Sequence, residues 1–188
     1  MPTAHASLAP SPWVQRWAQG PGGGPTALDV ACGRGRHVRW LVDRGLRVTA
    51  IDRDPDALAA LRDTPAELIA ADIESGPWPL AGRRFDLVVV THYLWRPLLA
   101  TIVEAVAPGG RLVYETFALG NASVGKPSNP DFLLRPGELL DAVRPALRVI
   151  AFEDGFLDAP PRFVQRIAAV READAPASAS AGPPRYPL

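Results

Sequence analysis

The stretch "LDVACGRGRHVRWL", residues 28 to 41, constrains the fold more than any other part of the chain. An apolar run that carries one acid, Asp29, leads into the turn Gly33-Arg34-Gly35, and apolar residues at helical spacing follow. A strand, a glycine turn and a helix together form a cradle for a nucleotide. The two glycines allow backbone dihedrals that a Cβ would penalise, and they let the backbone approach a ligand closely.

Strand and helix patterns alternate through most of the chain, which predicts a doubly wound parallel sheet. Strands are expected at residues 27–31, 47–51, 66–70, 85–90, 111–117, 147–152 and 163–170. Helices are expected between them, one of them running to Val106 and stopped by Pro108-Gly109-Gly110. The last two strands are joined by "EDGFLDAPPR", which has no helical pattern and favours a hairpin. The predicted fold is therefore α/β, a Rossmann-like sheet of about seven strands that is mostly parallel, with an antiparallel last strand.

Length and composition set the limits of this domain. The chain of 188 residues has 20 basic and 20 acidic side chains, which argues against a nucleic-acid binder that relies on bulk positive charge. Its single cysteine excludes an internal disulfide and a multi-cysteine metal site, and no metal is expected. We expect a flexible segment at 1–26 with a short helix at about 12–19, a domain at 27–171 and a disordered tail at 172–188. No signal-peptide pattern and no apolar run of about 20 residues is visible, so a cytoplasmic protein without a membrane partner is expected.

Acidic side chains stand at the predicted carboxyl ends of three strands, where a doubly wound sheet binds its ligand. Asp52 ends the second strand and can accept hydrogen bonds from two ribose hydroxyls; Asp72 ends the third and can accept one from an adenine amino group. Glu115 ends the fifth, and Asp29 within the first strand can attract a ligand ammonium. Ribose, adenine and an ammonium together describe S-adenosylmethionine, and no phosphate is required.

The segments "LDVACGRGRHVRWL", "VTAIDRDPDAL", "LIAADIE", "FDLVVVTHYL" and "APGGRLVYETF" occur in the order and spacing of class I S-adenosylmethionine-dependent methyltransferases. The chain resembles this family over about residues 12 to 170, and its size and loops resemble the small-molecule members of the tellurite and thiopurine type. One departure is Ala31, where the family often carries glycine. The resemblance implies S-adenosylmethionine as cofactor and a cofactor site made of Asp29, Ala31, Cys32, Gly33, Gly35, Asp52, Arg53, Asp72, Ile73 and Thr91.

The segment "THYLWRP", residues 91 to 97, follows the fourth strand and is the best candidate for the acceptor side. His92 and Tyr93 are the candidate catalytic residues; His92 can act as a general base because its ordinary pKa lies near 6.5, or both side chains only pack against the cofactor. The segment at residues 119–136 is predicted to form a lid over the acceptor. The candidate acceptor contacts are Trp95, Arg96, Glu115 and Lys126. The basic residues Arg96 and Lys126 either attract an anionic acceptor or face solvent, and Glu115 stands at a strand end that faces the crevice.

Two nearby side chains invite a functional reading that we do not adopt. Cys32 has no base beside it in sequence and is interpreted as a small wall residue and not as a catalytic thiol. His37 lies beside Arg36 and Arg39 and is expected on a solvated helix face.

The sequence therefore predicts methyl transfer from S-adenosylmethionine to a small-molecule acceptor. A non-catalytic cofactor-binding or regulatory protein is the main alternative. An NAD-dependent oxidoreductase is less compatible, because Val38 stands where a dinucleotide site needs its third glycine and Asp29 would repel a phosphate.

Overall fold

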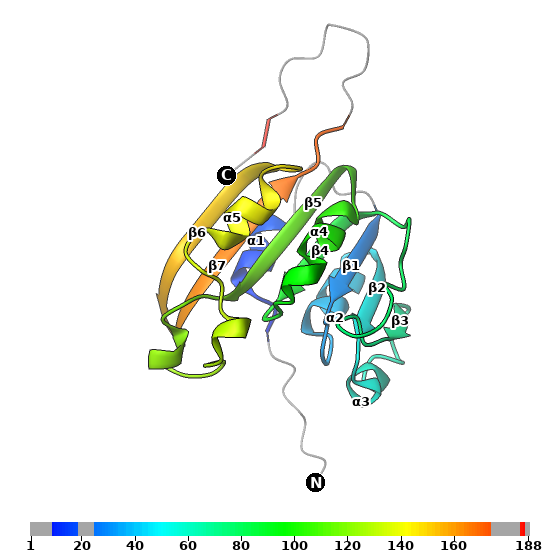
Figure 1. Cartoon of the computed structure of the whole chain (residues 1–188). Helices are drawn as coiled ribbons and strands as arrows, with labels where there is room; N and C mark the ends of the chain where they lie inside the picture. Colours follow the sequence, from blue (N-terminus) through cyan, green and yellow to red (C-terminus); the bar gives the residue numbers. More distant parts are fainter. Residues whose placement is uncertain (1–8, 19–24, 174–184, 187–188) are drawn as a thin grey trace, which may run out of the picture.

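The computed structural model describes residues 9–18, 25–173 and 185–186, and these form one sheet with helices on both of its faces (Figure 1). The strands are β1 (Thr26–Val30), β2 (Arg47–Asp52), β3 (Glu67–Ala70), β4 (Phe85–Thr91), β5 (Val106–Phe117), β6 (Arg148–Asp158) and β7 (Pro161–Val170). The helices are α1 (Pro12–Trp17), α2 (Arg36–Val42), α3 (Pro55–Ala59), α4 (Leu99–Glu104) and α5 (Glu138–Val143).

The seven strands run in the order β3-β2-β1-β4-β5-β7-β6. The first five strands in this order are parallel to one another. Strand β7 pairs antiparallel with both β5 and β6. The predicted fold class, including the antiparallel last strand, is confirmed. Since β1 lies between β2 and β4, the chain reverses its direction of strand addition at β1, and this switch point is where doubly wound sheets bind ligands.

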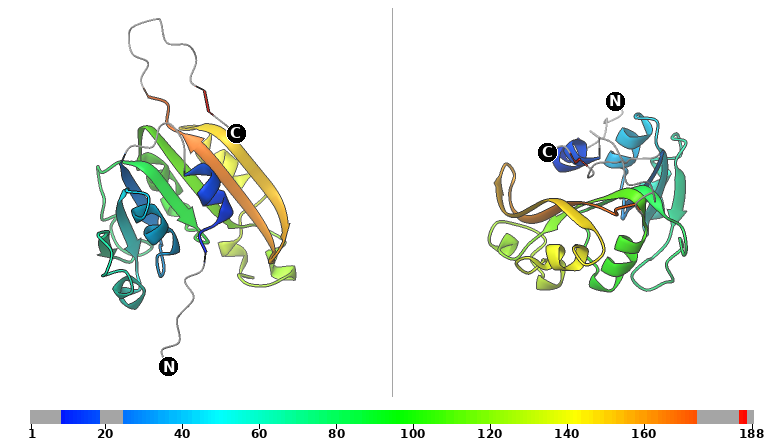
Figure 2. Two further views of the ribbon diagram at one scale, coloured as in Figure 1. Left: turned by 180° about the vertical axis from the view of Figure 1, so that it is seen from behind. Right: turned by 90° about the horizontal axis from the view of Figure 1, so that it is seen from above.

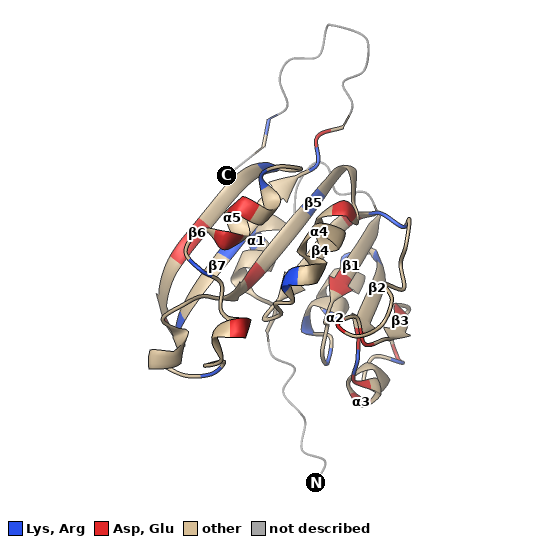
Figure 3. Cartoon of the chain, viewed as in Figure 1, with Lys and Arg blue, Asp and Glu red and all other residues tan. Residues whose placement is uncertain are grey.

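Helices α1 and α2 cover one face of the sheet, and α4 and α5 cover the other (Figure 2). Strand β4 is buried along nearly its whole length, which explains its continuous apolar sequence "FDLVVV". Among the described residues, no helix has the length and apolar character needed to cross a membrane. Acidic and basic residues are interspersed along the ribbon in Figure 3, as the balanced charge of the sequence leads one to expect.

Helix α1 is a packed part of this structure. Ser11 caps it by accepting a hydrogen bond from the Trp13 backbone N–H, and Trp13, Val14 and Trp17 are buried against the sheet. The Trp17 carbonyl accepts a bond of 2.6 Å from the Arg111 guanidinium on β5. The helix is shorter than the predicted 12–19, and most of the predicted disordered tail lies outside the described residues.

The helix before β5 is also shorter than predicted. Helix α4 ends at Glu104, and Val106 already pairs with Phe85 in the sheet. The expectation that the helix runs to Val106 is therefore wrong, because this fully buried valine is worth more in the sheet than in another helical turn. The glycines after Pro108 shape the strand itself: a Cβ on Gly110 would come within 2.9 Å of the Phe85 carbonyl oxygen.

Candidate active site

The glycine turn between β1 and α2 is built by backbone conformation and by bonds to the neighbouring strand. The Cys32 N–H donates to the Ile51 carbonyl at 3.0 Å, and the Gly35 N–H donates to the Cys32 carbonyl at 3.0 Å. Gly33 and Gly35 have φ of 54° and 73°, in the left-handed region that glycine adopts without strain. Ala31 has φ of 53°, and this left-handed conformation is strained because alanine carries a Cβ.

Asp52, at the end of β2, holds this turn in place. One carboxylate oxygen accepts the Gly33 N–H at 2.7 Å, and the other accepts the Asp54 N–H at 2.9 Å. Each oxygen keeps a further lone pair, so ribose recognition and the support of the turn can share one side chain. The sequence spacing predicts that Asp52 recognises ribose, but it does not predict that Asp52 supports the turn.

A hollow next to the turn collects residues from the ends of β1, β2, β3 and β4. Its lining consists of Ala31, Asp52, Arg53, Ala71, Asp72, Ile73, Glu74 and Tyr93. Five of the predicted cofactor residues are therefore brought together, and Ala71, Glu74 and Tyr93 are additions that the sequence had not assigned to the cofactor. Asp72 also closes its own turn by accepting bonds from the backbone N–H groups of Glu74 and Ser75 and from the Ser75 hydroxyl.

Asp29 is the buried acid of the site. Only 1% of it is exposed, and its Oδ2 has no hydrogen-bond partner among the described residues. Burial raises its pKa to about 8, although Arg36 acts in the opposite direction. An unpartnered buried carboxyl beside a glycine turn fits a ligand that brings its own donor, as the ammonium of S-adenosylmethionine would. Cys32 is buried as well, and because burial raises its pKa it stays a thiol, as expected of a wall residue.

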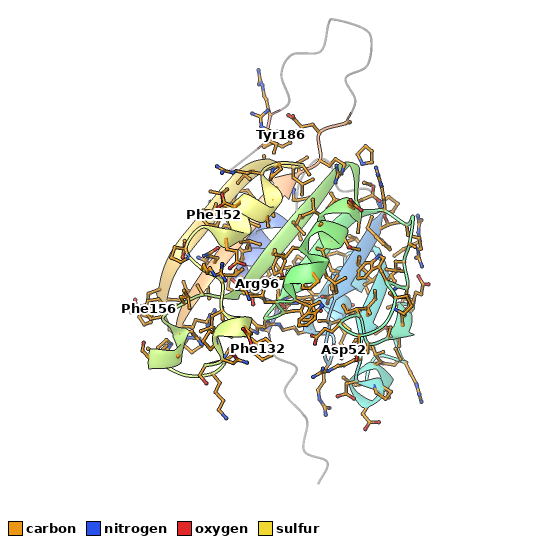
Figure 4. The ribbon with its side chains drawn as sticks, in the orientation of Figure 1. Asp52, Arg96, Phe132, Phe152, Phe156 and Tyr186 are labelled. Carbon is orange, nitrogen blue, oxygen red and sulfur yellow. The ribbon has the colours of Figure 1, made fainter. Side chains whose placement is uncertain are left out.

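A second hollow, of about 300 Å³, continues from the first beyond β4 and β5. Its lining consists of Arg53, Glu74, His92, Tyr93, Leu94, Thr116, Phe117, Pro127 and Phe132. Arg53, Glu74 and Tyr93 line both hollows, so the two sites meet there. Asp52 and Phe132, one from each hollow, lie toward the same edge of the sheet in Figure 4.

The two candidate catalytic side chains differ in what they can do. The Tyr93 hydroxyl is buried and has no hydrogen-bond partner within the described part of the chain. Burial raises its pKa, so it remains protonated and can donate a hydrogen bond but not serve as a base. Burial and the nearby Arg36 lower the pKa of His92, so its imidazole is neutral at pH 7 and can accept a proton. The His92 ring is stacked on Phe117 with 4.9 Å between ring centroids. Thr91, just before it, accepts a long bond of 3.5 Å from the Arg36 guanidinium.

The predicted lid, residues 119–136, is fastened by Arg96. The guanidinium forms a two-pronged ion pair with Glu138 at 2.6 and 3.0 Å and donates to the carbonyls of Asp131 and Leu133. Since its donors are used in this way, the predicted attraction of an anionic acceptor by Arg96 is not supported. Trp95 is half-buried and Lys126 is exposed, and neither lines the two hollows described above.

Two further predictions are corrected by the packing of α1. Glu115 does not line the acceptor hollow: it is 1% exposed, accepts a bond from the Ser11 hydroxyl and lies 3.5 Å from the Arg166 guanidinium. His37 is 1% exposed and accepts the Ser11 backbone N–H, so the expected solvated face is wrong. Burial lowers the pKa of His37 to about 3, which keeps the ring neutral and able to accept that bond. No pattern around either residue reveals that α1 covers it.

The sheet order and the two hollows define a class I fold for binding S-adenosylmethionine, and the comparisons with known proteins agree. Residues 27–110 match the family described as "Methyltransferase domain". Over residues 27–110 the chain is thus similar to the class I S-adenosylmethionine-dependent methyltransferases, whose cosubstrate is S-adenosylmethionine.

Similar sequences and structures come from several bacteria. A malonyl-[acyl-carrier protein] O-methyltransferase of Serratia marcescens is 35% identical over 103 residues, which are 52% of this chain and 40% of that protein. TehB from Haemophilus influenzae is 20% identical with a TM-score of 0.63, over 78% of this chain and 57% of that one. A methyltransferase from Mesorhizobium loti is 22% identical with a TM-score of 0.64, over 83% of this chain and 95% of that one. The chain thus spans about 40% of the length of the malonyl-[acyl-carrier protein] O-methyltransferase.

Proposed function

We propose that this protein transfers the methyl group of S-adenosylmethionine to a small-molecule acceptor. The observation that carries the proposal is the junction of the two hollows at Tyr93, beside His92. A small acceptor is supported by the size of the second hollow, about 300 Å³, at the lower end of ordinary ligand pockets. The proposal includes a cytoplasmic location, with neither nucleic acid nor membrane as a partner.

Bound S-adenosylmethionine supplies a methyl group that is already activated on a sulfonium. In the proposed site, Asp29 attracts the ammonium, Asp52 accepts the ribose hydroxyls, and Asp72 and Ile73 border the adenine. The chain's task is then mostly to align the two reactants and exclude water, which can contribute about 7–11 kcal/mol to lowering the barrier.

His92 has a role only for some acceptors. A neutral imidazole can take the proton that an alcohol or an amine loses as it is methylated. A thiolate, a carboxylate or another oxyanion carries no such proton, and His92 then only borders it. The Tyr93 hydroxyl can donate a hydrogen bond to either kind of acceptor.

Calorimetric titration with S-adenosylmethionine, S-adenosylhomocysteine and NADH tests the cofactor half. We expect heat with both adenosyl ligands, and Asp52→Ala should weaken their binding at least tenfold. Asp141→Ala is the matched control, because Asp141 lies on α5 in an exposed ion pair with Arg144. Binding of NADH alone, or unchanged S-adenosylhomocysteine affinity in Asp52→Ala, contradicts the assignment.

Transfer of a radiolabelled methyl group tests the acceptor half. The panel consists of thiols, amines, carboxylates and chalcogen oxyanions, and oxygen nucleophiles enter first because curated relatives carry the name malonyl-[acyl-carrier protein] O-methyltransferase. Turnover of any member that His92→Gln or Tyr93→Phe slows supports an enzyme with this acceptor site. Cofactor binding without turnover over the whole panel favours a non-catalytic binding protein.

A further inference from the structure

Ser11 is the centre of a buried hydrogen-bond network that joins three elements. Its backbone N–H donates to His37 Nε2 on α2 at 3.1 Å, and its hydroxyl donates to Glu115 Oε1 on β5 at 3.0 Å. The same hydroxyl accepts the Trp13 N–H at 3.2 Å at the start of α1. Ser11, His37 and Glu115 are 5%, 1% and 1% exposed. Buried polar groups of this kind are costly unless they are paired, so the three elements are held in one arrangement.

The network lies directly behind His92. Glu115 is the register partner of Thr91, and its carbonyl oxygen accepts the His92 N–H at 2.9 Å. His92 has φ of 54°, a left-handed conformation that strains a residue with a Cβ. Such strain persists only where the surroundings hold it, and it gathers at functional sites. The backbone bond to Glu115 and the stacking on Phe117 are the contacts that hold this residue.

The side chain of Glu115 is itself held from two sides. Ser11 donates to one oxygen, and Arg166 on β7 lies 3.5 Å from the other and also pairs with Glu153. The carboxylate of Glu115 therefore links Ser11, at the start of α1, to the end of β5 beside His92. His37, the other partner of Ser11, lies two positions beyond Gly35, so the same network reaches the glycine turn.

We propose that Ser11 and Glu115 are positioning residues, which hold His92 in its strained conformation at the edge of the acceptor hollow. Ser11, which caps helix α1, then acts on the site although it precedes the residues 27–110 that match the family. The importance of Ser11 and Glu115 for catalysis rests on the proposed function, but their effect on the conformation of His92 does not. Helix α1 already packs on the sheet through Trp13, Val14 and Trp17. The bond from Ser11 to the buried carboxylate of Glu115 is therefore not needed for stability alone.

The ionisation of His92 reports its position. Arg36 and Arg162 act to lower its pKa together with burial, while Glu115 acts to raise it. If the ring leaves this environment, its pKa moves toward the ordinary 6.5. An NMR titration of the His92 ring therefore detects displacement without any need for an acceptor.

The experiment compares Ser11→Ala, Ser11→Thr and Val14→Ala with the wild-type protein. Ser11→Thr keeps the hydroxyl, and Val14→Ala weakens the packing of α1 without touching the network. The resonance of His92 is assigned with His92→Gln, and thermal unfolding of each variant is recorded. Glu115→Gln serves as a second perturbation that remains informative if Ser11→Ala does not fold.

We expect Ser11→Ala to shift the His92 titration toward 6.5 and to lower kcat at least tenfold, with KM for S-adenosylmethionine changed less than threefold. Ser11→Thr should restore both, and Val14→Ala should change neither beyond its effect on stability. Loss of the Glu115 charge by itself lowers the pKa of His92 further, so only a shift toward 6.5 reports displacement of the ring. A His92 titration that does not move toward 6.5 in Ser11→Ala overturns the inference, and if Ser11→Ala does not fold, the same result in Glu115→Gln overturns it. Failure of the proposed function has a different signature, which is absence of turnover in the wild-type protein while the titration still responds to Ser11→Ala.

Discussion

Replacing Asp29 by asparagine should change the pH dependence of folding. The side chain is almost fully buried in β1, and its pKa is raised to about 8. In the unfolded chain the same carboxyl ionises near 3.9. The folded state therefore binds a proton that the unfolded state releases, and the free energy of unfolding falls as the pH rises between about 4 and 8. Asparagine has nearly the same shape and does not ionise in this range.

The size of the effect follows from the slope of one proton, about 1.4 kcal/mol per pH unit. From pH 5 to pH 7 the wild-type protein should lose about 2.7 kcal/mol relative to Asp29→Asn. Urea unfolding of both proteins at pH 5, 6 and 7, without cofactor, measures this difference, and the comparison cancels other groups that titrate. Asp29→Asn should also weaken the binding of S-adenosylhomocysteine, because asparagine cannot ionise to pair with the ammonium of the ligand.

Stability curves of the two proteins that run parallel between pH 5 and pH 7 would contradict a protonated Asp29 in the folded state. Parallel curves would mean that Asp29 is ionised in the folded protein and that Arg36 or water supplies the missing partner. A difference that grows with pH but leaves the binding of S-adenosylhomocysteine unchanged would support the buried acid while removing its role toward the cofactor.

Four other substitutions test the turn and the lid. Ala31→Gly should raise the free energy of unfolding by about 1 kcal/mol in urea titrations, because glycine adopts the φ of 53° without strain. Gly33→Ala should cost about 1 kcal/mol, since no atom lies within 4 Å of the new Cβ, whereas Gly35→Ala should cost clearly more and weaken S-adenosylhomocysteine binding because its Cβ would overlap Leu61. Equal losses from the two glycine variants would contradict the packing at Leu61. Arg96→Met should raise KM for the acceptor and speed proteolysis within residues 119–136, while S-adenosylhomocysteine affinity stays constant; unchanged proteolysis would show that the guanidinium does not fasten the lid.

Much of the cofactor half could be predicted from the sequence because its signals are local. Alternating strand and helix patterns predict a doubly wound sheet, and such a sheet gathers its carboxyl ends at one edge. Asp52 ends β2 and Asp72 follows the end of β3 by two residues, so both are expected near the glycine turn, and both line the hollow there. The hairpin at the end of the chain was visible in the same way, because its connection is too short and too irregular for a crossover helix.

The acceptor half depends on contacts between distant parts of the chain. The alternation of side chains along β5 does not show which element covers the face that carries Glu115. Ser11, the hydrogen-bond partner of Glu115, lies 104 positions earlier in the chain. Arg96 looked free in sequence, but Glu138 neutralises it across 42 positions. Backbone pattern and strand ends thus suffice to predict the class of fold and the positions of Asp52 and Asp72 beside the glycine turn. Which charged side chains stay free for a ligand depends on tertiary packing, because a buried charge takes whichever partner the packing brings to it.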